Sequence, residues 1–299
     1  MSSISASAAT IECDGNLSDI VITSAVNTQT NMEMVPTNES INASACAGFF
    51  EGNDQPLPTF NTGIWGDGLL NGEKHKKGAT WFGAPGAFIT EDDLQDLDGD
   101  GLVNDPGWIF LGKDDGKGFE TTNLTQWFMD GSSFDLDRYL NINFSCAEEC
   151  KSGDWSLFFP EPERMLAELA SSIFGDRFFD HLAFSFKVGK NTIIYDFNFN
   201  MINEGLNDSF DLAIPHNFEG EFDLSGFAHD ISHISVWARD PIGVTSVDEP
   251  LSLYLFICSL LALGLIRVTR KKESKLELWQ RWGARKAAFK SFLIKNGHE

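Results

Sequence analysis

The sequence predicts a mainly β protein: an antiparallel β-sandwich of jelly-roll type, followed by a single C-terminal transmembrane helix. Several short segments alternate hydrophobic and polar residues with a period of two, as strands with one buried face do. Turn residues such as Gly, Pro and Asn separate these segments, and one segment has the pattern of a soluble helix. Residues 251–266 form an uncharged apolar run. Short strands with little helix favour a sandwich.

In the first half of the chain the strand signals are short. Residues 27–42 predict a long loop, because they are polar and rich in Asn and Thr. In the segment 133–145 every second residue belongs to an apolar face, and Arg138 would be the single polar member of that face. Strands are predicted at residues 19–26, 107–112, 133–145 and 153–159.

The second half begins with the one predicted soluble helix, residues 163–173, which has Pro162 near its start and Gly175 after its end. A hairpin follows, in which residues 181–188 and 192–201 both alternate around a turn that contains Gly189. We expect one face of this hairpin to be buried and the other to be solvated. Further strands are predicted at residues 218–224, with the carboxylates pointing outward, and 231–239.

The formal net charge of −22 hides a division of the chain. Residues 1–266 contain 12 basic and 41 acidic residues, whereas residues 267–299 contain ten basic and three acidic ones, so the two parts carry −29 and +7. So acidic a body would repel phosphates, and we exclude nucleic acid as a partner. The charge suits divalent cations or solubility in a salty medium.

The C-terminal part has three sections in a fixed order. A polar tetrapeptide, Val247, Asp248, Glu249 and Pro250, precedes the apolar run. As a helix the run would span about 24 Å, close to the thickness of a hydrocarbon core, although a buried core helix could have this length. The basic cluster that follows, expected on the cytoplasmic side, is Arg267, Arg270, Lys271 and Lys272.

This topology would place residues 1–246 outside the cytoplasm, together with four of the five cysteines. An even number of cysteines in such a compartment is typical of disulfides. We predict the pairs Cys13–Cys46 and Cys146–Cys150, and the alternative is four reduced thiols. Residues 1–8 contain the small-residue pattern Ala6-Ser7-Ala8, and they are either the end of a signal peptide or a flexible terminus.

The order of tetrapeptide, apolar helix and basic cluster resembles the PEP-CTERM sorting signal of Gram-negative bacteria. Glu249 and Pro250 match the family's tetrapeptide, whereas Asp248 stands where the family most often has Pro. The resemblance implies that an exosortase is the partner and that the protein is first anchored in the inner membrane. It further implies a final location at the cell surface or outside the cell, in association with extracellular polysaccharide.

The resulting division of the chain has five parts. They are residues 1–8, a β-sandwich ectodomain at 9–240, a linker at 241–246, the sorting and anchor segment at 247–272, and a basic tail at 273–299. The tail departs from the family, whose members end soon after the basic cluster. It is either an amphipathic helix on the inner leaflet or an extension without a selected role.

One acidic stretch has the D-x-D-x-D-G spacing of calcium loops. Gly101 permits the sharp turn, but Gly107 stands where an EF-hand has its bidentate Glu, so a shorter calcium loop is predicted. The alternative is an ordinary acidic surface turn. The candidate Ca²⁺ ligands are Asp96, Asp98, Asp100, Leu102, Asn104 and Asp105.

No sequence motif predicts catalysis. The six histidines are scattered without an H-E-x-x-H motif, and no Gly-x-Ser-x-Gly elbow occurs. A glycosidase pair of carboxylates is defined by its spacing in three dimensions, so the sequence leaves it open. We therefore expect a non-enzymatic exported envelope protein. The alternative is a surface module that binds carbohydrate, acts as an adhesin or binds ice. A secreted glycoside hydrolase ranks below both.

Overall fold

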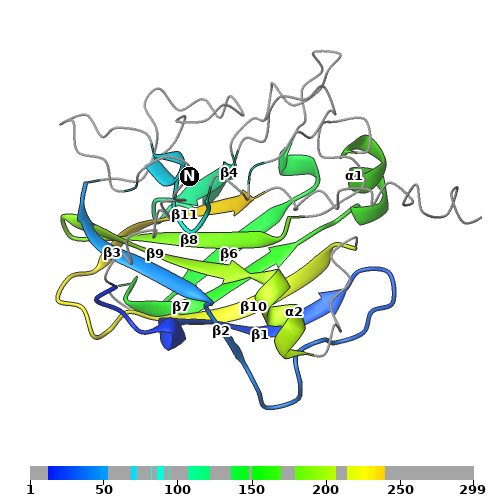
Figure 1. Ribbon diagram of the computed structural model, residues 1–299, viewed down its shortest axis with the longest axis horizontal. Helices are drawn as coiled ribbons and strands as arrows, with labels where there is room; N and C mark the ends of the chain where they lie inside the picture. Colours follow the sequence, from blue (N-terminus) through cyan, green and yellow to red (C-terminus); the bar gives the residue numbers. More distant parts are fainter. Residues whose placement is uncertain are drawn as a thin grey trace, which may run out of the picture. The chain divides into compact units, whose positions relative to one another are not determined.

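The computed structural model describes residues 13–52, 69–72, 82, 86–90, 94, 107–121, 136–147, 150–169, 179–206 and 214–239. Within these ranges the strands form two sheets in which all pairs are antiparallel, as Figure 1 shows. The prediction of a mainly β, antiparallel two-sheet fold is confirmed. No helix in these ranges is long and apolar enough to cross a membrane, and the predicted span at 251–266 lies outside them.

The five-stranded sheet has the order β2-β1-β10-β7-β6. Its strands are β2 (Ile41–Asn42), β1 (Ile20–Asn27), β10 (His216–Asp223), β7 (Ser152–Phe158) and β6 (Asn141–Cys146). The six-stranded sheet has the order β3-β9-β8-β11-β4-β5. Its strands are β3 (Ala45–Glu51), β9 (Asn191–Asn198), β8 (His181–Val188), β11 (Ile231–Arg239), β4 (Trp108–Asp114) and β5 (Phe119–Thr121).

Short helices connect or flank the strands. The α-helices of the described ranges are α1 (Pro162–Leu169) and α2 (Phe199–Gly205). The 3₁₀ turns are η1 (Leu17–Asp19), η2 (Leu69–Asn71) and η4 (Leu136–Arg138). Met165 of α1 is buried, as the predicted helical stripe requires.

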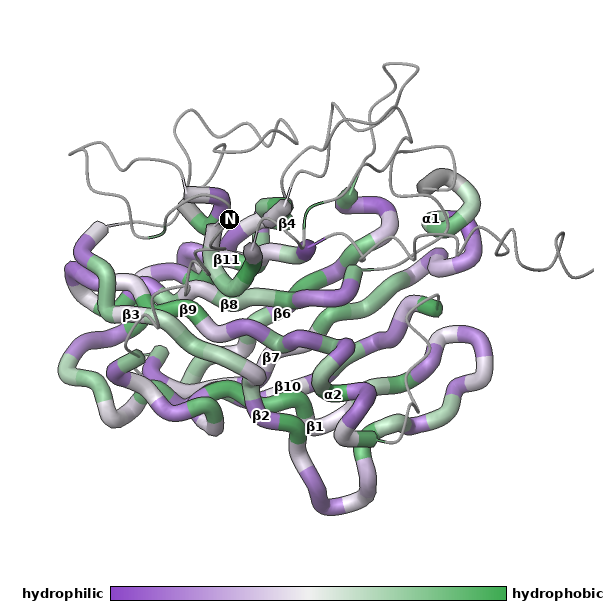
Figure 2. The backbone as a smooth tube through the Cα atoms, viewed as in Figure 1, coloured by the Kyte–Doolittle hydropathy of each residue, from purple (hydrophilic) through white to green (hydrophobic). Residues whose placement is uncertain are grey.

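The main hydrophobic core lies between the two sheets. The indole of Trp155 on β7 packs against Phe184 on β8, with ring centroids 4.7 Å apart. On β10, Phe218 and Phe222 are buried in this core while the carboxylates between them face outward, as the alternation predicted. In Figure 2 hydrophobic and hydrophilic positions occur along the strands of both sheets, as expected from such alternation.

A second core covers the opposite face of the six-stranded sheet. Leu70, Phe82 and Ile89, from the segment between β3 and β4, pack there with Trp108 and Trp237. All eight residues of β8 are consequently buried. The prediction that the hairpin has a solvated face is therefore wrong, because residues about 90 to 120 positions earlier in the chain lie over that face.

Hydrogen bonds fix the covering segment, which is the part of the chain between β3 and β4 that contributes Leu70, Phe82 and Ile89, to the start of β4. Asn71 donates from Nδ2 to the carbonyl oxygen of Trp108 at 2.8 Å and accepts from the Trp108 backbone N–H at 2.7 Å. The indole N–H of Trp108 donates to the carbonyl of Ala87 at 2.6 Å. The buried polar atoms of the covering segment thus replace contacts with water by contacts with the sheet.

Four local predictions differ from the structure. The second hairpin strand ends at Asn198, whose side chain accepts from the N–H of Met201 and so caps α2, leaving Met201 59% exposed. The strand predicted from residue 133 begins only at Asn141, because η4 precedes it. Arg138 at the end of η4 is exposed and Tyr139, which follows it, is buried, so the predicted apolar face with Arg138 is wrong. The predicted loop at 27–42 contains β2.

Gly220 on β10 permits the close packing of Trp155, its cross-strand partner. A Cβ atom at Gly220 would lie 2.2 Å from the carbonyl oxygen of Val21 and 2.4 Å from the Trp155 indole nitrogen. The strand can therefore hold no larger residue here without a shift of its neighbours.

We expect Gly220→Ala to lower the free energy of unfolding by about 1–3 kcal/mol, because overpacking displaces the indole or the strand. Chemical denaturation measures this change. Gly226→Ala is the matched control, since a Cβ atom there meets nothing within 4 Å. Equal stability of the two variants would contradict this packing.

Candidate functional site

The structure describes the four predicted disulfide cysteines, but not the other predicted site residues. The candidate Ca²⁺ ligands between Asp96 and Asp105 lie outside the described ranges, as do the tetrapeptide Val247–Pro250 and the basic cluster. Among the residues that are described, no group of three or more His, Cys, Asp or Glu side chains is arranged to hold a metal ion. The calcium prediction thus remains a prediction.

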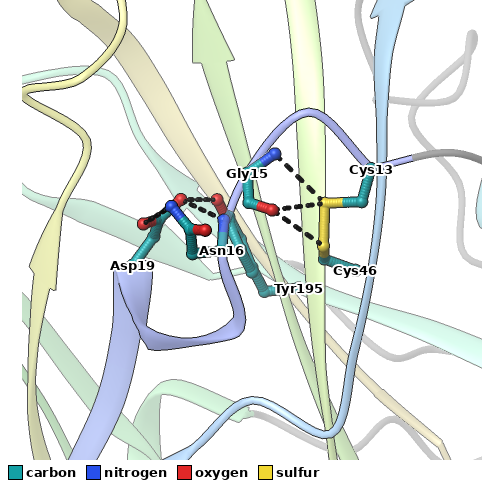
Figure 3. Close-up of a disulfide and its surroundings, with 6 residues drawn as sticks. All are labelled: Cys13, Gly15, Asn16, Asp19, Cys46 and Tyr195. Carbon is teal, nitrogen blue, oxygen red and sulfur yellow. Dashed lines mark hydrogen bonds between the residues drawn. A yellow bond between two sulfur atoms is a disulfide. The ribbon is translucent and has the colours of Figure 1, made fainter.

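Cys13 and Cys46 form a disulfide, with their Cα atoms 5.7 Å apart, as predicted (Figure 3). Cys13 precedes β1 of the five-stranded sheet, and Cys46 lies on β3, an edge strand of the six-stranded sheet. The backbone N–H of Asp14 also donates to the carbonyl of Gly48 on β3 at 2.9 Å. This disulfide therefore joins the two sheets near the N-terminal end of the fold.

A buried hydroxyl strengthens this junction between the sheets. The phenol of Tyr195 on β9 donates to the Asp19 carboxylate at 2.7 Å, and the same carboxylate accepts from the Asn16 backbone N–H at 2.8 Å (Figure 3). Burial raises the pKa of the Tyr195 phenol, and the Asp19 carboxylate raises it further. The phenol consequently stays protonated and acts as a donor.

Cys146 and Cys150 form the second predicted disulfide, with their Cα atoms 4.8 Å apart. They bracket the turn between β6 and β7, where the N–H of Ala147 donates to the carbonyl of Ser152 at 2.9 Å. This short crosslink closes the end of the β6–β7 hairpin.

A network of charged side chains is buried at one end of β8. The Arg239 guanidinium donates to both oxygens of Asp180, at 3.2 and 2.9 Å. The Nδ1 atom of His181 lies 3.0 and 2.9 Å from the two oxygens of Asp196, within hydrogen-bond distance of both. Burial raises the pKa of Asp196, while the adjacent His181 and then Arg239 oppose this shift. Because these four side chains are almost completely buried, they hold strand ends together and offer no open site.

The outer face of the five-stranded sheet is exposed, in contrast to the outer face of its partner. Four of its strands, β1, β6, β7 and β10, border a groove of about 330 Å³, which is at the lower end of the usual volumes of small-ligand sites. The side chains that line it are mostly polar. They include Asn143, Ser145, Asp154, Ser156, Glu219 and Glu221.

Strand pairing concentrates negative charge in this groove. Asp154 on β7 stands directly opposite Glu221 on β10, and Glu219 follows two residues along the same strand face. Within the described ranges these three carboxylates have no hydrogen bond or ion pair, and no Lys or Arg lines the groove. Two carboxylates directly opposite each other destabilise a sheet, so their presence here is not explained by folding.

An exposed aromatic ring lies on the same face. Phe158 follows Ser156 by two residues on β7 and therefore projects on the same side, opposite Asn141 of the edge strand β6. Its side chain is 36% exposed, although a ring of this size is usually buried. An aromatic surface beside a polar groove can stack against a sugar ring while carboxylates, amides and hydroxyls bind its substituents.

Part of this face was predictable from the sequence. It predicted that Glu219 and Glu221 point outward, but it singled out neither the outward residues of β7 nor Phe158. The alternation of Asp154, Ser156 and Phe158 was the available signal. Which outward face remains open depends on where the second core packs, and the sequence carries no local sign of that.

Comparison with known proteins gives no match: no family model, no curated protein and no solved structure matches the chain. The chemistry of the exposed face therefore has to be argued from its own residues.

Asp180→Asn tests the buried network. We expect it to lower the free energy of unfolding by about 3–5 kcal/mol, because it leaves the buried Arg239 guanidinium without its full counter-charge. Denaturant unfolding of Asp115→Asn provides the control, since the Asp115–Lys117 pair is exposed and should contribute less than about 1 kcal/mol. A loss at Asp180 as small as that at Asp115 would show that the network contributes little.

Proposed function

We propose that this chain is a non-enzymatic, exported envelope protein whose β-sandwich binds extracellular polysaccharide through the exposed face of the five-stranded sheet. In this proposal the C-terminal segment is a PEP-CTERM-like sorting signal read by an exosortase. The apolar run at 251–266 holds the protein in the inner membrane before sorting. The loop that contains Asp96, Asp98 and Asp100 binds Ca²⁺ as a structural ion.

Disulfides and charge support the export. Two crosslinks among four cysteines are typical of oxidising compartments and are rare in the cytosol. The acidic body and the basic C-terminal end have opposite signs, which agrees with a body outside and a positive end inside.

The exposed face is the observation that carries the binding function. Folding of a sandwich does not require three carboxylates without a partner in the described part of the chain, nor an exposed Phe158 on the outer surface. Together these groups offer what sugar rings require: an apolar surface for the ring and polar atoms for its hydroxyls. The groove lies mostly over β7 and β10, which are each paired on both sides, and it reaches the edge strand β6.

Phe158→Ala tests this role. We expect it to weaken binding to the recognised polysaccharide about tenfold, because an aromatic contact is among the larger contributions at a binding surface. Calorimetry against a panel of soluble polysaccharides measures the affinity. Met201→Ala is the matched control, since Met201 is an exposed apolar residue on α2, away from the groove. The same loss in both variants, or no binding to any polysaccharide, would contradict the proposal.

Double substitution of Glu249 and Pro250 by Ala tests the sorting signal. We expect the variant to accumulate unprocessed in the inner membrane of a host that has the exosortase, because the tetrapeptide is the part that is read. Fractionation and mass spectrometry of the C-terminus follow the outcome. Asp248→Pro, which moves the tetrapeptide towards the family's usual residue, should be processed at least as well as the unaltered chain. Recovery of the unaltered chain in the soluble cytosolic fraction would contradict both export and anchoring.

A further inference from the structure

We infer that Asn38 is the acceptor of an N-linked oligosaccharide, which is added to the chain after export. This inference rests on the export that is part of the proposed function, and it does not depend on the polysaccharide-binding face. The tripeptide Asn38-Glu39-Ser40 has the N-x-S/T spacing of N-glycosylation acceptors, and all three of its residues are exposed.

The acceptor spacing is frequent in this chain. Six of the 19 asparagines have Ser or Thr at the second position after them, although Ser and Thr make up only 40 of the 299 residues. The spacing therefore occurs more often than the composition accounts for. Two of the six, Asn123 and Asn207, lie outside the described ranges. The others are Asn16, Asn38, Asn42 and Asn143.

Exposure distinguishes these four asparagines from the rest. All four are exposed. Nine further asparagines lie in the described ranges, and of these only Asn31 and Asn141 are exposed. Several of the nine serve the fold: Asn71 bonds to the backbone of Trp108, and Asn198 caps α2. The asparagines with the acceptor spacing are thus the ones whose amides an enzyme can reach.

Two of the four acceptor tripeptides are held in strands. Asn42 lies on β2, and the hydroxyl of its partner Ser44 accepts from the Asn198 backbone N–H at 3.0 Å. Asn143 lies on β6 in a ladder with β7, and its amide donates to Asn141 at 2.9 Å. A transferase that binds the tripeptide in a conformation of its own would have to break these contacts.

The tripeptide that begins at Asn16 is fixed in a turn. The Asn16 backbone N–H donates to the Asp19 carboxylate at 2.8 Å, and the Asn16 amide donates to the other oxygen of this carboxylate at 3.5 Å (Figure 3). The carbonyl of Leu17 accepts from the Ala43 N–H at 3.1 Å. This site therefore has the same obstacle as the two strand sites.

The loop that carries Asn38 is restrained least. The chain between β1 and β2 leaves the sandwich there (Figure 1), and the Glu39 N–H donates to the carbonyl of Pro36 at 3.0 Å to close a turn. The side chains of Asn38, Glu39 and Ser40 make no hydrogen bond or ion pair with the described part of the chain. Such a loop opens locally at little cost, which suits a tripeptide that an enzyme has to bind.

The turn explains an asparagine at this position but not the spacing. Asn38 has a φ of 65°, in the left-handed region that Asn adopts more readily than most residues. Asn31 has a φ of 55° and is exposed too, but Glu33 stands at its second position. The turn places no demand on Ser40, whose hydroxyl completes the acceptor tripeptide. Asn31 is therefore a matched control for Asn38.

The reaction is a glycosyl transfer by a membrane oligosaccharyltransferase. Its donor is an oligosaccharide joined through C1 of its first sugar to a lipid diphosphate on the non-cytoplasmic side of the membrane. The Asn38 amide nitrogen forms a bond to C1, and the bond between C1 and the diphosphate oxygen breaks. The lipid diphosphate leaves with the electron pair of that bond, and the amide nitrogen gives up one proton to a base of the enzyme.

Mass spectrometry of the full chain, isolated from the exported fraction of a host that has such a transferase, tests the inference. The peptide that contains Asn38 should carry a glycan on this residue, identified by sugar fragment ions. Ser40→Ala should abolish the glycan, whereas Ser40→Thr should retain it because Thr keeps the hydroxyl. Asn31→Gln should leave it unchanged. These side chains are exposed, so all three variants should fold.

The outcomes separate this inference from the proposed function. An exported chain without a glycan on Asn38, or a glycan that persists in Ser40→Ala, would overturn the inference and leave export standing. Glycans on Asn42 or Asn143 but not on Asn38 would overturn it as well, because the freedom of the loop would then not select the site. A glycan on Asn38 in a chain that binds no polysaccharide would support the inference and contradict the proposed binding face. Recovery of the chain only from the cytosol, without a glycan, would overturn both.

Discussion

Burial of both faces of the six-stranded sheet is the constraint on which the rest of the fold depends. The strand β8 lies in the middle of this sheet, between the main core and a second core contributed by the segment before β4. Every polar side chain on such a strand has to find a partner in the protein, because water cannot reach it. His181 is accordingly bonded to Asp196, and the Lys187 ammonium donates to the carbonyls of Gly52 and Lys190.

The same constraint makes the two sides of the sandwich unequal. One outer face has become a protein interior, and its polar residues serve stability. The other outer face has kept its alternation and is open to solvent, with carboxylates that have no partner in the described part of the chain. The charged groups of the two faces thus differ: those buried beside β8 are paired, whereas Asp154, Glu219 and Glu221 on β7 and β10 are exposed.

Crosslinks hold this asymmetric structure together at its N-terminal end. The Cys13–Cys46 disulfide closes a separation of 33 residues and joins the sheets, which in the chain-entropy model stabilises the fold by about 3–4 kcal/mol. The hydrogen bond from Tyr195 to Asp19 joins the same sheets a short way along the chain. The exposed face therefore belongs to a sheet that is fixed to its partner both covalently and by packing, which suits a binding surface that must keep its shape.

Local alternation was enough to determine the fold class, the positions of β8, β10 and β11, and the outward direction of Glu219 and Glu221. The even number of cysteines predicted disulfides, and the structure confirms the predicted pairs, although four cysteines by themselves allow three pairings. Alternation gives the direction of a side chain relative to its own strand, but it does not show whether solvent or another part of the chain lies on that side. The tertiary structure alone decided that the outward residues of β8 are buried, that Asp154 stands opposite Glu221, and that Phe158 is exposed on the face that carries the groove. Each of these depends on contacts between segments far apart in the chain, and neither a strand's period nor its composition records such contacts.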